Sequence, residues 1–150
     1  MTEAPRTIGL VVKHNRAEAA ALARTIAERL RERGVQVLVE RELAAAPGVR
    51  VVEKRAMVDE ADLIVALGGD GTLLGIARLV GARELRVLGI NLGGLGFLTV
   101  FSTAEALPVI ERVFTGDFQL DRRATLAVRV LREGRVVAES QVLNDAVINK

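Results

Sequence analysis

The chain has 150 residues, half of them apolar, so it can bury the core of one ordinary domain. Its 21 basic and 19 acidic residues are interspersed and its only aromatic residues are four phenylalanines, which argues against a base-stacking or strongly basic nucleic-acid surface. The lack of cysteine excludes disulfides and thiolate metal sites, and the early glutamate and short apolar run at the start favour neither a signal peptide nor a membrane span. We therefore expect a cytoplasmic protein with no membrane or nucleic-acid partner.

The first two thirds of the chain alternate predicted strands with predicted helices. Short apolar, β-branched runs are typical of strands buried between helices, and they occupy residues 7–14, 35–40, 62–69 and 85–94. Apolar periodicity predicts helices over 17–34, 53–61 and 71–82, with Gly34 as the C-terminal cap of the first. Residues 41–49 are expected to form a loop or a short helix. The alternation predicts an open, parallel, Rossmann-like α/β sheet over residues 1–101.

A helix is expected to follow this α/β segment. Its apolar periodicity spans residues 102–116, with Ser102 or Thr103 as the N-cap and Glu105 in the first turn, where a carboxylate stabilises the positive end of the helix. We expect residues 102–115 to link the first domain to a second one.

The last part of the chain has the two-residue period of β-strands. Runs at 126–131 and 136–142, joined across 132–135, predict a β-hairpin. A hairpin alone is marginally stable in water and exposes edge strands, which favours self-association. We interpret residues 116–150 as the start of a β-rich second domain that is truncated here.

Three glycines surround an aspartate where the third predicted strand ends and its helix begins: Gly68, Gly69 and Gly71 around Asp70. Ligands of open α/β sheets collect at this end of the strands, glycines let a backbone approach them, and the N–H groups of the next helix favour phosphate. A carboxylate would repel phosphate unless it holds Mg²⁺ or accepts the proton of an attacking hydroxyl, which indicates phosphoryl transfer. The alternative is that Asp70 only caps the helix and the glycines only turn the chain. The spacing matches neither the phosphate loop that ends in Gly-Lys-Ser/Thr nor the dinucleotide fingerprint.

A second glycine-rich stretch, GINLGGLGFLT at residues 89–99, follows the next predicted strand and should face the same crevice. Its glycines make room for a bulky ligand, and Leu95 and Phe97 would line a pocket for a flat base. Ordinary core packing is an alternative explanation for Phe97. A third stretch, LND, places Asn144 beside Asp145, a donor and an acceptor suited to ribose hydroxyls and base edges. By itself an Asn-Asp pair also marks a turn.

In this order and spacing, GGDGTLLGIAR, GINLGGLGFLT and LND resemble the bacterial NAD kinases, which use ATP or polyphosphate. The opening IGLVVKHNRAEA is similar to the first strand and helix of that family. The resemblance extends over essentially all 150 residues and corresponds to about the first half of a typical member. GGDGT alone is shared with diacylglycerol and sphingosine kinases and loosely with phosphofructokinases, whereas the second stretch is particular to NAD kinases.

The resemblance implies transfer of a phosphoryl group from ATP or polyphosphate, accompanied by Mg²⁺ or another divalent metal, to the 2′-hydroxyl of the adenosine ribose of NAD, giving NADP. Asp70 matches the catalytic aspartate of the family, which orients that hydroxyl and accepts its proton. The matching substrate-binding residues are Asp70, Gly71, Leu74, Leu95, Phe97, Asn144 and Asp145. The matching phosphate-binding residues are Gly68, Gly69, Gly71 and Thr72, and no protein group is expected to bind the metal directly.

Two features depart from the family pattern. Asp145 stands where the family has glutamate, which keeps the charge but shortens its reach to the ribose. The second domain of the family continues with another glycine-rich phosphate and substrate segment, so this portion is expected to be inactive or weakly active. The full-length protein is expected to form a homo-oligomer, a dimer or a tetramer.

Two other classes of protein stay open. A lipid kinase of the diacylglycerol or sphingosine kinase type uses the same GGDGT element, but such kinases carry Glu-Val shortly after it, where this chain has Gly75 and Ile76. A non-catalytic nucleotide-binding or assembly module would bind NAD without turnover and form a stable oligomer.

Overall fold

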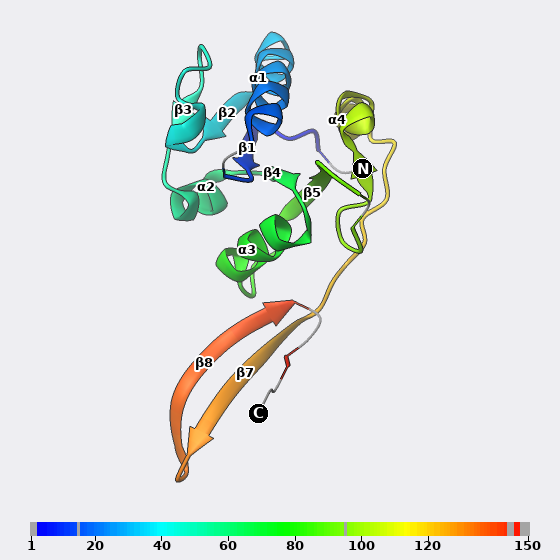
Figure 1. Cartoon of the computed structure of the whole chain (residues 1–150). Helices are drawn as coiled ribbons and strands as arrows, with labels where there is room; N and C mark the ends of the chain where they lie inside the picture. Colours follow the sequence, from blue (N-terminus) through cyan, green and yellow to red (C-terminus); the bar gives the residue numbers. More distant parts are fainter. Residues whose placement is uncertain (1–2, 15, 95, 144–145, 148–150) are drawn as a thin grey trace.

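A parallel six-stranded sheet forms the centre of the structure, a computed structural model that describes residues 3–14, 16–94, 96–143 and 146–147. Its strands are β1 (Thr7–Val12), β2 (Gln36–Val39), β3 (Arg50–Val51), β4 (Leu63–Gly68), β5 (Arg86–Asn91) and β6 (Phe101–Ser102). Their spatial order is β3-β2-β1-β4-β5-β6, and Figure 1 labels the first five of these strands. Every neighbouring pair is parallel, which confirms the predicted open, Rossmann-like α/β architecture.

The sheet has two strands more than the four that periodicity predicted. β3 and β6 contain two residues each, too few for a two-residue period to stand out, and each adds one edge to the sheet. The strand predicted over 85–94 is shorter than expected. β5 ends at Asn91 because the chain then turns: the N–H of Gly93 donates to Oδ1 of Asn91 (2.9 Å).

Helices cover both faces of the sheet. They are α1 (Ala17–Glu32), α2 (Lys54–Glu60), α3 (Asp70–Val80) and α4 (Ala106–Thr115), with short 3₁₀ helices η1 (Arg41–Leu43) and η2 (Thr103–Glu105). α1 and α4 pack in one hydrophobic cluster and α2 and α3 in another, on opposite faces of the sheet (Figure 1). The two central strands β1 and β4 are buried along almost their whole length, as continuous apolar runs predict. In the described part of the chain, no helix combines the length and apolarity that crossing a bilayer requires.

The helix α1 ends where the sequence predicted. Gly34 has a positive φ of 75°, its N–H donates to the carbonyl of Arg31 (2.8 Å), and the N–H of Val35 donates to the carbonyl of Leu30 (3.1 Å). This pair of hydrogen bonds is a Schellman motif, and it satisfies carbonyls that the end of a helix leaves free.

The strand order reverses between β1 and β4. From β1 the chain crosses through α1 to β2 on one side, whereas from β4 it continues through α3 to β5 on the other side. In a doubly wound sheet this is the switch point, and ligands bind in the crevice outside the carboxyl ends of the two strands. The turns that follow β1 and β4 therefore border the expected site.

The helix predicted over 102–116 is present as η2 followed by α4, and it packs on the sheet. Ala106, Val109 and Ile110 are buried in the cluster between α1 and the sheet. The predicted cap is confirmed: the carboxylate of Glu105 accepts hydrogen bonds from the backbone N–H (2.8 Å) and the hydroxyl (2.7 Å) of Ser102. This capping box holds the start of the helix.

The predicted hairpin is a separate antiparallel sheet of β7 (Thr125–Arg132) and β8 (Arg135–Leu143). Glu133 and Gly134 form its turn with φ values of 51° and 73°, as a two-residue type I′ turn requires. No residue of either strand is buried, and Figure 1 shows the hairpin projecting from the α/β part, where β8 contacts α3. This small sheet confirms the predicted change from α/β to β structure.

Candidate functional site

A cavity of about 280 Å³ opens at the switch point, at the carboxyl ends of β1, β4 and β5. The segments that follow these strands supply its lining residues: Lys13, Arg16, Gly68, Gly69, Asp70, Asn91, Leu92, Gly93, Gly94 and Gly96. Both glycine-rich stretches of the sequence therefore face one crevice. We call it the switch-point cavity.

The carboxylate of Asp70 joins the two glycine-rich stretches. Its Oδ1 accepts hydrogen bonds from the backbone N–H groups of Leu98 (3.1 Å) and Thr99 (3.0 Å) and from the Thr99 hydroxyl (2.9 Å). Its Oδ2 accepts one from the N–H of Phe97 (2.9 Å). Asp70 does not cap α3, because Gly69 is the N-cap and no side-chain cap hydrogen bond is formed. The carboxylate instead fixes the loop after β5 against the start of that helix.

The same hydrogen bonds hold the pKa of Asp70 below its ordinary value of 3.8. Burial raises the pKa, but the Thr99 hydroxyl and the backbone N–H groups of Phe97, Leu98 and Thr99 donate to the charged form and together outweigh burial. Asp70 is therefore ionised at neutral pH and is a weak base. What it offers a hydroxyl is mainly a well-placed acceptor.

Two glycines leave no room for a side chain: Gly96 lies against the Asp70 carboxylate, and Gly68 lies against Thr72. A Cβ on Gly96 would lie 2.2 Å from Oδ1 of Asp70 and 2.6 Å from the hydroxyl oxygen of Thr99. A Cβ on Gly68 would lie 2.1 Å from the hydroxyl oxygen of Thr72. Other glycines leave open space, since an added Cβ would meet no atom within 4 Å at Gly69, Gly71 and Gly94.

Two buried polar side chains support the carboxylate from behind. Asn91 is 6% exposed and Thr99 is fully buried. The Nδ2 of Asn91 donates to the Thr99 hydroxyl oxygen (2.9 Å), and that hydroxyl donates to Asp70. Sequence reasoning did not single out Thr99, although it is the polar residue that ends the second glycine-rich stretch.

Gly71, Thr72, Leu74 and Phe97 lie outside the lining of the switch-point cavity. Gly71 is exposed in the first turn of α3, Thr72 is half-buried against Gly68, and Leu74 is half-buried further along the helix. The side chain of Phe97 is 76% exposed, so core packing does not explain it. Three predicted residues fall outside the described part of the chain: Leu95, Asn144 and Asp145.

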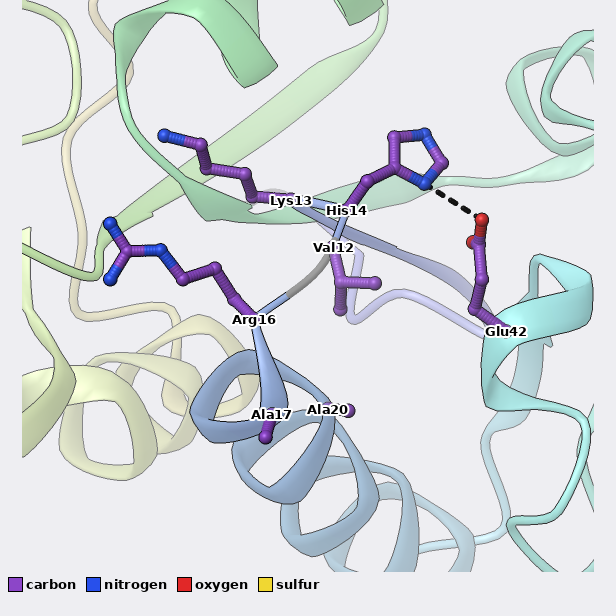
Figure 2. A pocket seen from close by; sticks show the side chains of 7 residues that line it. All are labelled: Val12, Lys13, His14, Arg16, Ala17, Ala20 and Glu42. Atoms are coloured by element: carbon purple, nitrogen blue, oxygen red, sulfur yellow. Dashed lines mark ion pairs between the residues drawn. The ribbon is translucent and has the colours of Figure 1, made fainter.

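Two cations that sequence reasoning did not single out line the switch-point cavity. Lys13 directly follows β1, and Arg16 directly precedes α1. Both also line a second cavity of about 370 Å³, where Nδ1 of His14 lies 2.7 Å from the carboxylate of Glu42 (Figure 2). Their signal in the sequence is a pair of basic residues in the short turn between a central strand and the next helix.

Fold and site together define a class of protein: a doubly wound α/β domain with glycine-rich turns at its switch point, an arrangement whose geometry suits a phosphate-bearing ligand. The family model described as the ATP-NAD kinase N-terminal domain matches residues 8–118 of this chain.

Individual relatives agree with the family match. The NAD kinase of Syntrophobacter fumaroxidans is 41% identical over 145 residues, which cover 97% of this chain and 51% of that protein. The NAD kinase of Geotalea daltonii is 42% identical over 146 residues, with the same coverage. The crystal structure of yeast NADH kinase complexed with NADH has a TM-score of 0.76 at 20% identity, covers 91% of this chain and 46% of its own, and shows the shared fold.

The chain therefore belongs to the NAD kinase family. It spans about half the length of the curated relatives it matches.

Proposed function

We propose that this chain is the part of an NAD kinase that carries the catalytic aspartate. The whole protein would transfer a phosphoryl group from ATP or polyphosphate to the 2′-hydroxyl of the adenosine ribose of NAD, giving NADP. The observation that carries the proposal is the Asp70 carboxylate, held between two glycine-rich segments at the switch-point cavity. Membership of the family and the naming of the relatives as NAD kinases support the reaction. By itself this half-length chain is proposed to be inactive or weakly active.

We assign the ribose hydroxyl to Oδ2 of Asp70. A carboxylate oxygen has two lone pairs, and Oδ1 already accepts hydrogen bonds from three donors, whereas Oδ2 accepts only the N–H of Phe97 among the described residues. The second lone pair of Oδ2 can accept the ribose O–H, orient its oxygen toward phosphorus and take the proton as the new bond forms. Because the lowered pKa makes Asp70 a weak base, orienting the hydroxyl is a larger part of its proposed role than accepting the proton. A group of this kind contributes about 10²–10⁴-fold to the rate.

The phosphate that is transferred is proposed to lie at the start of α3. The N–H of Thr72 donates to the carbonyl of Gly69 (3.0 Å), but the N–H groups of Asp70 and Gly71 have no acceptor within the helix. The open space at Gly69 and Gly71 lets a phosphate oxygen reach these groups. Gly68 and Thr72 pack against each other and shape the same turn.

A divalent ion such as Mg²⁺ is proposed to arrive with the donor. Within the described ranges, no three His, Asp or Glu side chains converge in a way that would hold a metal ion, and Asp70 is the one carboxylate that lines the switch-point cavity. Such a donor set fits an ion held mainly by substrate phosphates, as Mg²⁺ often is. The ion would neutralise charge on the phosphates of the donor.

The adenosine of NAD is proposed to contact an apolar group and a polar pair. Leu74, Leu95 and Phe97 would contact adenine, and Asn144 with Asp145 would contact ribose and the base edge. The position of Phe97 supports this, since its backbone N–H is bound to Asp70 while its ring stands exposed beside the proposed ribose. An exposed aromatic face next to a ribose can stack on a flat base.

The wider organisation is also proposed. It comprises an α/β domain over 1–101, a linking helix over 102–115 and the start of a β-rich domain over 116–150, in a cytoplasmic homo-oligomer without nucleic-acid or membrane partners. The separate hairpin sheet with exposed edges supports the second domain and self-association.

Calorimetric titration of NAD, together with NADP formation by the full-length protein, tests the function. Phe97→Ala is expected to weaken NAD binding about tenfold, since stacking on an aromatic ring contributes about 1–3 kcal/mol per base. Asp70→Asn is expected to leave NAD affinity nearly unchanged and to lower NADP formation by about 10²–10⁴-fold.

Asp62→Asn is the matched control. Asp62 accepts hydrogen bonds from the backbone N–H groups of Arg6 (2.8 Å) and Thr7 (2.9 Å) at the opposite end of β4, so its loss affects stability and not the reaction. Undiminished NADP formation by Asp70→Asn would contradict the assignment. A chain that does not bind NAD at all would place most of the substrate site in the rest of the protein.

A further inference from the structure

Lys13 and Arg16 stand on either side of the turn between β1 and α1, the first crossover of the doubly wound sheet. Both line the switch-point cavity together with Gly69 and Asp70, and both line the second cavity as well. Figure 2 shows their side chains extending to the same side, away from the histidine–glutamate pair of the second cavity. Two cationic groups therefore border the cavity in which phosphoryl transfer is proposed.

These two cations are not neutralised within the described structure. His14 pairs with Glu42, whereas neither Lys13 nor Arg16 forms an ion pair with any described residue. Among the residues that the structure describes, Asp70 is the one carboxylate that lines the switch-point cavity, and its oxygens already accept hydrogen bonds from the loop after β5. Positive charge therefore predominates at the rim, which attracts an anion.

The place of these cations in the fold indicates phosphate. In doubly wound sheets that bind dinucleotides, the first strand-to-helix turn holds the pyrophosphate, usually through glycines that bring backbone N–H groups close. Here the described residues of that turn carry side chains, and the glycines follow β4 and β5 instead. A guanidinium group binds phosphate oxygens through paired N–H donors, and an ammonium group acts as a compact point charge. The side chains of Arg16 and Lys13 can therefore replace the missing backbone donors.

We propose that Lys13 and Arg16 bind the phosphate chain of the phosphoryl donor and hold it against the glycine turn after β4. The assignment to the donor rests on the proposed function, because the group that crosses to a hydroxyl at Asp70 is the terminal phosphate of that chain. ATP and polyphosphate share a run of three or more phosphates, which offers charge to both cations at once. NAD has only a two-phosphate bridge, and free inorganic phosphate is a single group.

Titration of inorganic tripolyphosphate into the chain tests the pair without any turnover. Lys13→Gln and Arg16→Gln each remove one charge and are each expected to weaken binding about tenfold, as the loss of a charge-assisted hydrogen bond does. Arg24→Gln is the matched control, since Arg24 is exposed on α1 and lines neither cavity. Its tripolyphosphate Kd is expected to stay within about twofold, because a distant exposed charge is screened.

The same variants are titrated with NAD and with inorganic phosphate to separate the sources of phosphate. Tripolyphosphate affinity lost in both variants but kept in Arg24→Gln, with NAD affinity unchanged, supports the donor assignment. NAD affinity that falls as far as tripolyphosphate affinity would assign the pair to the dinucleotide and overturn the proposal. Equal effects of all three substitutions, or no preference of the unaltered chain for tripolyphosphate over single phosphate, would overturn it too.

NADP formation by the full-length protein is measured separately. This measurement distinguishes a failure of the proposed kinase reaction from a failure of the role proposed for Lys13 and Arg16. If the Lys13 and Arg16 effects appear but no NADP is formed, the site for a phosphate chain is supported and the kinase reaction is refuted. If NADP is formed and neither substitution changes the KM of the donor, the reaction stands and the role of the two cations is refuted.

Discussion

At the scale of single residues, the two carboxylate oxygens of Asp70 make different contacts. One oxygen holds Leu98 and Thr99 through three hydrogen bonds, and the other holds Phe97 through one. The first oxygen thereby holds the loop after β5, and the second retains a lone pair that the proposed ribose contact would use. Because the loop orients the carboxylate to which it is bound, an acceptor for the proposed substrate would already be in place before binding.

Gly96→Ala tests this arrangement without changing any charge. The new Cβ would lie 2.2 Å from Oδ1 of Asp70, so the loop and the carboxylate must move apart. We expect a loss of about 1–3 kcal/mol in the free energy of unfolding, typical of overpacking, measured by urea denaturation. Gly94→Ala is the control, because open space adjoins Gly94. Equal stability of the two variants would show that the Asp70 contact does not hold the loop.

At the scale of elements, helix ends fix the segments around the sheet. α1 stops at Gly34 through its Schellman hydrogen bonds, and η2 and α4 start at Ser102 through the carboxylate of Glu105. The backbone N–H and the hydroxyl of Ser102 hold the pKa of Glu105 below its ordinary value of 4.5. The charged carboxylate is therefore the form that stabilises this helix start.

The lowered pKa of Glu105 predicts how stability depends on pH. A carboxyl whose pKa is lower in the folded state than in the unfolded state contributes fully above its unfolded pKa, and its contribution is lost as the pH falls through the folded pKa. Glu105→Gln is expected to lower the melting temperature at neutral pH, and the difference from the unaltered chain should shrink below about pH 4.5. Thermal unfolding followed by circular dichroism across this range measures it. Ser102→Ala removes one of the two donors and should give an intermediate profile; a difference that does not change with pH would contradict the expectation.

At the scale of the whole molecule, the hydrophobic clusters and the hairpin are separate. Both clusters consist of residues from the α/β part and α4, and no residue of β7 or β8 belongs to either. The hairpin instead exposes apolar side chains, with Val130 at 53% and Leu131 at 60% exposure. Its strands therefore contribute little burial to the stability of the α/β part.

A chain that ends at Phe118 tests this separation. Without residues 119–150 the melting temperature is expected to change by no more than about 4 °C, since the loss of exposed residues removes under about 1 kcal/mol. Circular dichroism and calorimetry on the shortened chain and the 150-residue chain measure it. Loss of the cooperative transition in the shortened chain would mean that the contact between β8 and α3 supports the fold.

Local patterns in the sequence were sufficient for the main elements. The periodicity of apolar residues and the residue preferences of turns depend on neighbouring residues only. They account for the strand β4, the helix cap at Gly34 and the turn at Gly134. The same holds for the glycines around Asp70, whose chemistry was evident before the fold. The two-residue strands β3 and β6 were missed, since only pairing to a neighbouring strand makes them strands.

The order of the strands was decided by the tertiary structure, and with it the composition of the site. Asp70 binds a loop 27 to 29 residues away in the chain, and Lys13 reaches the same cavity from another strand. No local pattern encodes such meetings, because they depend on β1 and β4 lying side by side at the point where the sheet reverses. The sequence by itself therefore determined the main elements and the glycine-rich stretches around Asp70, and the sheet topology determined that these stretches meet each other and that Lys13, Arg16 and Thr99 join them.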